Sequence, residues 1–284
     1  MGGDAVTALA AQVAELAAYP PGVALPAHAE IIVAQLLDAL EHGELRSAER
    51  DPAGRWRAVP WVKQGILLAF RVGHIVRMND EGLAPFFDKH TIPVRRFTIA
   101  DGVRIVPGGS SIRTGAYLAP GVVCMPPMFV NVGAWVGAGT MIDSHALVGS
   151  CAQIGARVHL SAAAQIGGVL EPINASPVVI EDEVIVGGNC GVYEGTVVRE
   201  QAVLGAGVVL TRGTPVYDLV KEQVYRGNAS EPLEIPSGAV VVPGSRAIAA
   251  GWGAAQGVAI QTPVIVKYRD EKTDVATALE SWLR

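Results

Sequence analysis

The chain has 284 residues, of which 50% are hydrophobic and 17% are charged, and its formal net charge is −5. This composition is typical of a globular protein, and the sequence shows no basic run that would favour nucleic acid as a partner. No apolar run in the sequence reaches membrane length, and the N-terminus carries Asp4 and Glu15 and lacks the positive start of a secretory signal.

The first third of the chain shows the spacing of helices. Apolar residues recur at helical intervals in Ala5–Ala18 and in Ile31–Leu40, and Trp61–Arg71 has the pattern of a buried helix. We therefore predict that residues 1–95 form a small helical domain, which we expect to cover the open end of the fold that follows.

From Val106 onward an apolar side chain recurs at every sixth position, with two interruptions. The repeat runs unbroken through Val106, Ile112, Leu118, Cys124, Val130, Val136, Ile142, Val148, Ile154, Leu160 and Ile166. It resumes through Ile180, Val186, Val192, Val198, Leu204 and Leu210, and returns at Ile235 and Val241. This period is typical of a parallel β-helix, in which three hexads make one triangular coil and the repeated side chains (the interior residues) stack inside it. We predict a mostly β protein with such a coil over residues 96–250.

Glycine often follows an interior residue directly, as at Gly137 and Gly155, and is expected there to permit a tight corner. Two segments, Glu171–Val179 and Pro215–Glu234, break the six-residue period. Insertions in a solenoid lie on its faces, and often on the binding face.

Residues 251–284 are predicted to form a short C-terminal extension. Ala259–Lys267 has the pattern of a strand. Lys272–Arg284 has the pattern of a helix, with Val275, Leu279, Trp282 and Leu283 on one face.

Several short motifs resemble one family of enzymes. The run Met141–Leu160 (MIDSHALVGSCAQIGARVHL), with Gly167–Pro172 (GGVLEP), Val178–Asp182 (VVIED) and Phe87–Lys89 (FDK), is similar to the tetrahydrodipicolinate N-succinyltransferase family. The resemblance implies a left-handed coil and a homotrimer that binds coenzyme A (CoA) between neighbouring subunits. It also implies succinyl transfer from succinyl-CoA, a cosubstrate and not a permanently bound cofactor, to ring-opened tetrahydrodipicolinate, L-2-amino-6-oxopimelate, in diaminopimelate and lysine biosynthesis.

The resemblance also implies catalytic residues. Asp143 matches the family's aspartate, one of two carboxylates that serve as acid and base. The position of the family's second carboxylate, a glutamate, holds Gly191, and a nearby family arginine is replaced by Asn189. His145 stands where the family has tryptophan, two residues from Asp143, so we expect both side chains on one side of a strand. His145 is therefore a candidate for the missing proton-transfer group, alongside Glu194 and a bound water.

Substrate and CoA contacts are expected from cationic and amide side chains. Arg104 matches a family arginine that holds a substrate carboxylate, a task that suits a guanidinium, and Arg113 and Asn131 also match family positions. Basic residues around the second interruption are candidates for the CoA phosphates. These are Arg212, Lys221 and Arg246.

Two alternatives stay open. One is a related N-acyltransferase that uses acetyl-CoA or a different amino-dicarboxylate, and the other is a non-catalytic hexapeptide-repeat scaffold. A metal site is not expected, because the repeat holds only two histidines and the three cysteines have no metal-ligand spacing. Because the cysteines also form no disulfide framework, we expect a reducing, cytoplasmic location.

Overall fold

The computed structural model describes residues 1–78, 86–228 and 230–270. The predicted N-terminal helices are confirmed as α1 (Gly3–Ala17), α2 (Ala29–Glu41) and α3 (Pro60–Val72). Proline at the first position of α3 suits a helix start, because its backbone has no N–H to leave unpaired. Short strands complete this part of the chain: β1 (Ala48–Arg50), β2 (Trp56–Ala58), β3 (Ile75–Met78) and β4 (Phe86–Lys89), followed by the 3₁₀ helix η1 (Ile99–Asp101).

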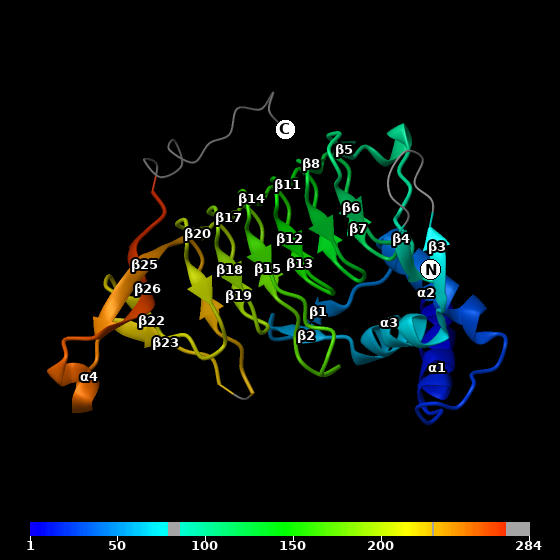
Figure 1. Cartoon of the computed structure of the whole chain (residues 1–284), viewed down its shortest axis with the longest axis horizontal. Helices are drawn as coiled ribbons and strands as arrows, with labels where there is room; N and C mark the ends of the chain where they lie inside the picture. Colours follow the sequence, from blue (N-terminus) through cyan, green and yellow to red (C-terminus); the bar gives the residue numbers. More distant parts are fainter. Residues whose placement is uncertain (79–85, 229, 271–284) are drawn as a thin grey trace.

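The helices share a hydrophobic core with the coil. Their buried cluster includes Val132 and Cys151 of the repeat, and the hairpin β1–β2 extends from the helices along the coil (Figure 1). Helical residues therefore pack against the side of the coil, a contact that the sequence pattern did not predict.

The repeat folds into three parallel sheets, here named faces 1, 2 and 3, and each coil adds one two-residue strand to each face. Face 1 contains β5 (Arg104–Ile105), β8 (Val123–Cys124), β11 (Met141–Ile142), β14 (His159–Leu160), β17 (Ile185–Val186) and β20 (Val203–Leu204). Face 2 contains β6 (Ser111–Ile112), β9 (Phe129–Val130), β12 (Leu147–Val148), β15 (Gln165–Ile166), β18 (Gly191–Val192) and β21 (Val209–Leu210). Face 3 contains β7 (Tyr117–Leu118), β10 (Trp135–Val136), β13 (Gln153–Ile154), β16 (Val179–Ile180), β19 (Val197–Val198) and β24 (Glu234–Ile235).

The register of these strands confirms the six-residue period. Met141 pairs with His159 and Ile142 with Leu160, so one coil is three hexads. The second residue of each strand points inward and the first points outward, as the alternation of a strand requires. One assignment was wrong: Ile105, and not Val106, pairs with Cys124 and joins the core. The hexad before Ile112 therefore has one extra residue.

The glycines after the interior residues have a different role from the one expected. Left-handed backbone occurs instead three residues after an interior residue, for example at His145 (φ 64°) and Cys151 (φ 65°). A Cβ at Gly137 would lie 2.5 Å from the carbonyl carbon of Gly155 in the next coil. These glycines allow close stacking of successive coils, because any side chain there would overlap the neighbouring backbone.

The C-terminal part extends face 1. The antiparallel strands β25 (Ala239–Ala247) and β26 (Ala259–Tyr268) flank α4 (Gly251–Ala255), and β22 (Val216–Asp218) and β23 (Gln223–Tyr225) lie beyond them. The predicted strand Ala259–Lys267 is confirmed by β26. The predicted helix Lys272–Arg284 lies outside the described residues.

Candidate functional site

The N-terminal part covers face 3 of the coil. Arg46 Nε donates a hydrogen bond to Gln153 Oε1 at 2.9 Å, and Ser47 Oγ donates to the carbonyl of Gly133 at 3.0 Å. On faces 1 and 2 apolar side chains point outward and are at least partly exposed. They include Met141, Ile185 and Val203 on face 1, and Phe129, Leu147 and Val209 on face 2.

Asp143 lies on the edge between faces 1 and 2, directly after β11. Its side chain is half-buried, and its Oδ1 accepts a hydrogen bond from the backbone N–H of Ser144 at 2.7 Å. One carboxylate oxygen is thereby oriented by the local turn. The position suits a base that meets a substrate at the surface of the coil.

His145 does not share a strand with Asp143, so that expectation was wrong. It is an exposed corner residue in the left-handed region, where histidine is better tolerated than most residue types. Its backbone N–H donates to the carbonyl of Pro127, and its carbonyl accepts from Gln165 Nε2 at 3.2 Å. The corner, and not the pleat of a strand, sets the direction of its side chain.

The candidates for substrate binding occupy two different edges of the coil. Arg104 opens β5 on face 1 and is exposed. Arg113 and Asn131 lie in successive coils on the edge between faces 2 and 3, each directly after an interior residue. Arg113 forms an ion pair with Asp88 of β4, and Asn131 Oδ1 accepts from the N–H of Val132 at 2.9 Å.

The edge occupied by Arg113 is thus tied to the FDK motif of the N-terminal part. Within one chain the structure does not bring Arg113 and Asn131 to the edge that carries Asp143, because face 2 separates the two edges.

The candidates for CoA binding are also spread out. Arg212 lines a hollow of about 380 Å³ with Arg57, Asn174 and Ser176, and its Nε is buried without a hydrogen-bond partner. Neither Lys221 nor Arg246 lines that hollow.

Lys221 and Arg246 occupy separate places in the C-terminal sheet. Lys221 Nζ lies 4.1 Å from the ring centroid of Tyr268. Arg246 is on β25, opposite Ile260 of β26. The three cations therefore do not form one phosphate site within a single chain.

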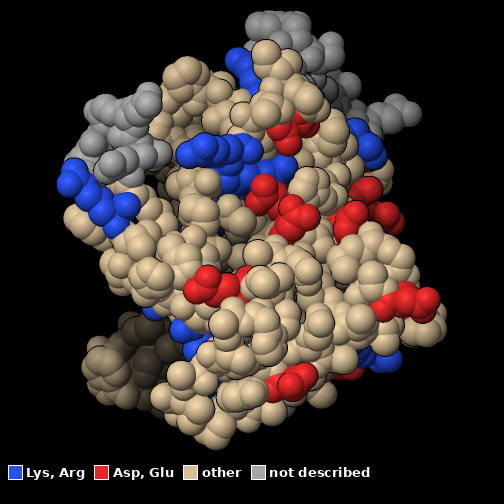
Figure 2. All heavy atoms as spheres, turned by 90° about the vertical axis from the view of Figure 1, so that its right-hand side faces the viewer, with Lys and Arg blue, Asp and Glu red and all other residues tan. Residues whose placement is uncertain are grey.

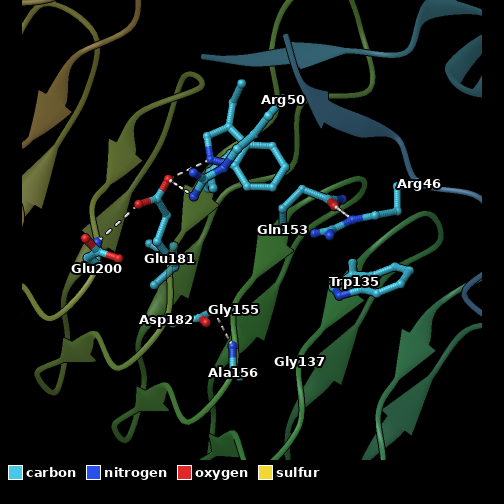
Figure 3. Close-up of a pocket in the computed structure, with 13 residues that line it drawn as sticks. Arg46, Arg50, Trp135, Gly137, Gln153, Gly155, Ala156, Glu181, Asp182 and Glu200 are labelled. Carbon is cyan, nitrogen blue, oxygen red and sulfur yellow. Dashed lines mark hydrogen bonds and ion pairs between the residues drawn. The ribbon is translucent and has the colours of Figure 1, made fainter. Parts of the chain in front are cut away.

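A separate cleft of about 340 Å³ lies between the β1–β2 hairpin and face 3 (Figure 3). The Arg46 guanidinium lies 4.1 Å from the ring centroid of Trp135, and burial lowers the pKa of Arg46 to about 10, with the neighbouring Arg50 as a second cause. Glu181 at the other end of the cleft is 6% exposed and binds Arg50, Trp56 and Arg199. The contacts of Glu181 with Arg50 and Trp56 therefore hold the hairpin against the coil.

The only part of this cluster that a sequence motif pointed to is Glu181, which belongs to the VVIED motif. A second missed residue is Tyr193, which lies on face 2 beside Gly191. An unusual pair of signals, a glycine at an outward strand position and an aromatic residue two places later, could have pointed to it.

The described residues contain no group of three or more histidine, cysteine, aspartate or glutamate side chains that could hold a metal ion. Across the same residues, no helix has both the length and the apolar character to cross a membrane. Lys/Arg and Asp/Glu side chains are interspersed on the face at the N-terminal end of the molecule (Figure 2).

Comparison with known proteins gives consistent matches. A family model described as tetrahydrodipicolinate N-succinyltransferase N-terminal matches residues 22–72, and one described as hexapeptide repeat of succinyl-transferase matches residues 177–212. The chain is 41% identical to the 2,3,4,5-tetrahydropyridine-2,6-dicarboxylate N-succinyltransferase of Polynucleobacter asymbioticus, over 91% of each protein. It is 42% identical to the protein of the same name from Nitrobacter hamburgensis, over 87% of each. A solved structure from Campylobacter jejuni, described as a 2,3,4,5-tetrahydropyridine-2-carboxylate N-succinyltransferase, aligns at 19% identity with a TM-score of 0.46 and covers 82% of this chain and 62% of that one.

Proposed function

Because the chain belongs to the tetrahydrodipicolinate N-succinyltransferase family, we propose that it transfers the succinyl group of succinyl-CoA to the amino group of L-2-amino-6-oxopimelate, in diaminopimelate and lysine biosynthesis. The observation that carries the proposal is the 41% identity to an enzyme of that name, over 91% of both chains. The position of Asp143, half-buried on an edge of the coil, supports it.

The chemistry needs a base, an oriented acceptor and a site for the leaving group. The amine nitrogen attacks the thioester carbon, the N–C bond forms, and the C–S bond breaks as CoA leaves with the electron pair. Asp143 takes the proton that the amine loses, and His145 is the candidate for a second proton transfer. Arg104, Arg113 and Asn131 bind the carboxylates of the acceptor, and Arg212, Lys221 and Arg246 bind CoA phosphates. Succinyl-CoA enters as a cosubstrate, and no permanently bound cofactor is required.

The active assembly is proposed to be a homotrimer of left-handed coils with sites between subunits. Faces 1 and 2 both carry outward apolar side chains, and Val209 on face 2 is 42% exposed in the isolated chain. Burying such side chains between subunits is favourable. A site between subunits would also unite groups that one chain holds on different edges. The domain boundaries at residues 95 and 250 remain predictions from the sequence. The cytoplasmic location also remains a prediction.

Gly191 and Asn189 stand where the family has glutamate and arginine. These differences favour a second candidate function, an N-acyltransferase that uses acetyl-CoA as donor or another amino-dicarboxylate as acceptor. Assays that combine succinyl-CoA or acetyl-CoA with tetrahydrodipicolinate, or with another amino-dicarboxylate, test both. Turnover that depends on succinyl-CoA supports the first proposal, and turnover with acetyl-CoA alone supports the second. Sedimentation of the active enzyme should give a trimer, whereas a stable active monomer would contradict the inter-subunit site.

A further inference from the structure

The ring of Tyr193 lies across the backbone of Gly191. A Cβ built at Gly191 would lie 2.5 Å from Tyr193 Cε2, 2.9 Å from Cζ and 2.9 Å from the phenolic Oη. A Cβ at Gly167, in the preceding coil, would lie 2.7 Å from Tyr193 Cδ1. Atoms do not approach so closely, so the ring can occupy this place only because both positions are glycine.

The place occupied by the ring is an outward position of face 2. Gly191 is the first residue of β18 and pairs with Gln165 of β15 and Val209 of β21, whose side chains point away from the coil. Gly191 contributes no side chain to that column. The Tyr193 phenol extends back from the edge after β18 and fills the gap.

The backbone of Tyr193 is well anchored. Its N–H donates to the carbonyl of Leu210 at 2.9 Å, and its carbonyl accepts from Thr196 Oγ1 at 2.7 Å. Within the described part of the chain the phenolic Oη has no hydrogen-bond partner, and the residue is half-buried. The hydroxyl is therefore held on the surface of face 2 with its hydrogen-bonding capacity unused by the described residues.

We propose that the Tyr193 hydroxyl donates a hydrogen bond to the acyl carbonyl oxygen of the donor while the amine attacks, and so replaces the side chain that Gly191 lacks. This inference rests on the proposed acyl transfer. A phenol carries an O–H group, which can donate a hydrogen bond to a carbonyl oxygen. The amine proton goes to Asp143, CoA leaves with the electrons of the C–S bond, and Tyr193 keeps its proton throughout. A hydrogen-bond donor aimed at the oxygen that becomes negative in the transition state lowers the barrier to reaction.

Within one chain, Asp143 and Tyr193 lie apart. Along face 2, β12, which follows Asp143, and β18, which holds Gly191, are separated by two inter-strand steps of about 4.8 Å each. The width of the sheet adds to this separation. Asp143 of one subunit and Tyr193 of its neighbour would together complete one site in the proposed trimer.

Tyr193→Phe tests the hydroxyl, because the ring that packs on the two glycines is kept. We expect kcat to fall by about 100-fold, the scale for one oxyanion donor, with KM values nearly unchanged. Tyr19→Phe removes a phenolic hydroxyl from the N-terminal part and should leave kcat unchanged. Thermal unfolding of both variants should match that of the wild type.

A second variant tests the position of the hydroxyl. Gly191 does not have left-handed backbone, so Gly191→Ala is compatible with the fold but displaces the ring. It should lower kcat about as much as Tyr193→Phe, and the double variant should be no worse than either single one, because both remove the same interaction. Additive losses would contradict the shared role.

The reverse exchange supplies a third readout. The double variant Gly191→Glu with Tyr193→Val places a carboxylate at the position of the family's glutamate and removes the ring that this side chain would meet. We expect it to recover transfer and to gain an acidic limb in its pH profile near the ordinary glutamate pKa of about 4.3. Full kcat in Tyr193→Phe would overturn the role of Tyr193 and leave the proposed function intact. Absence of any acyl transfer by the wild-type enzyme would overturn both.

Discussion

The indole Nε1 of Trp56 donates a hydrogen bond to Glu181 Oε1 at 2.8 Å, across the gap between the β2 strand and the coil. The same carboxylate oxygen binds Arg50 Nη2 and Arg199 Nη1, each at 2.9 Å. One buried carboxylate thus connects the hairpin to two successive strands of face 3. This contact joins the N-terminal part to the surface that it covers.

Glu181→Gln should lower the free energy of unfolding by about 2 kcal/mol, because the buried donors lose the charge that they bind. Urea unfolding gives this value. Glu183→Gln is the matched control two residues away: Glu183 pairs with Arg157 at the surface, where such pairs contribute about 0.5 kcal/mol. Equal effects from the two substitutions would show that Glu181 has no special role at this joint.

Asp143→Asn should leave the fold intact and lower kcat by at least about 100-fold, the usual scale for the loss of a general base. Asparagine keeps the size of the side chain and an oxygen that can accept from the N–H of Ser144. Circular dichroism checks the fold and steady-state kinetics check the rate. Unchanged turnover would remove Asp143 from the mechanism.

His145→Gln separates two roles for the exposed corner residue. If His145 transfers a proton, the substitution removes one limb of the wild-type pH profile and lowers kcat by at least about 100-fold, the scale for losing a general acid or base. Steady-state rates measured between pH 5 and pH 9 decide this. Full activity with an unchanged pH profile would show that His145 has no part in proton transfer. Its role would then be structural, because histidine tolerates the left-handed backbone of this corner.

The cysteines should be unreactive in the folded protein. Burial raises the pKa of Cys124 to about 12 and that of Cys151 to about 11, and burial also raises the pKa of Cys190. At pH 8 a thiol reagent should label the native chain slowly and the urea-unfolded chain fully, because only the thiolate reacts. Rapid labelling of native protein would contradict the burial.

The same shifts predict how stability depends on pH. Unfolded thiols ionise near pH 8.5 while the folded ones stay protonated, so the unfolded state gains stability as pH rises. The burial of Cys124 and Cys151 as neutral thiols contributes fully to the free energy of unfolding below about pH 8.5. Above that pH the free energy of unfolding should fall by about 1.4 kcal/mol per pH unit for each of these two thiols. Urea titrations at pH 7.5 and pH 10 measure the slope, and Cys124→Ala should reduce it.

The coil could be predicted from the sequence because its contacts are local and periodic. Ile142 must be apolar because it stacks between Cys124 and Leu160, eighteen residues away in each direction, and the same condition applies in every coil. The same holds for the N-terminal helices, whose buried stripes recur at 3.6 residues. Asp143 was found through its motif, which is contiguous in the chain.

The tertiary structure alone decided which distant residues meet. Glu181 and Trp56 are 125 positions apart, and no period in the chain relates a hairpin to the face that it covers. The position of the Tyr193 ring over Gly191 depends on the direction of the side chain and on a second glycine, Gly167, one coil away. Strand alternation does not predict the direction of the His145 side chain, because the residue lies at a corner where the backbone is left-handed. Periodicity determines what lies inside a coil, whereas the chemistry on its surface depends on how separate elements pack.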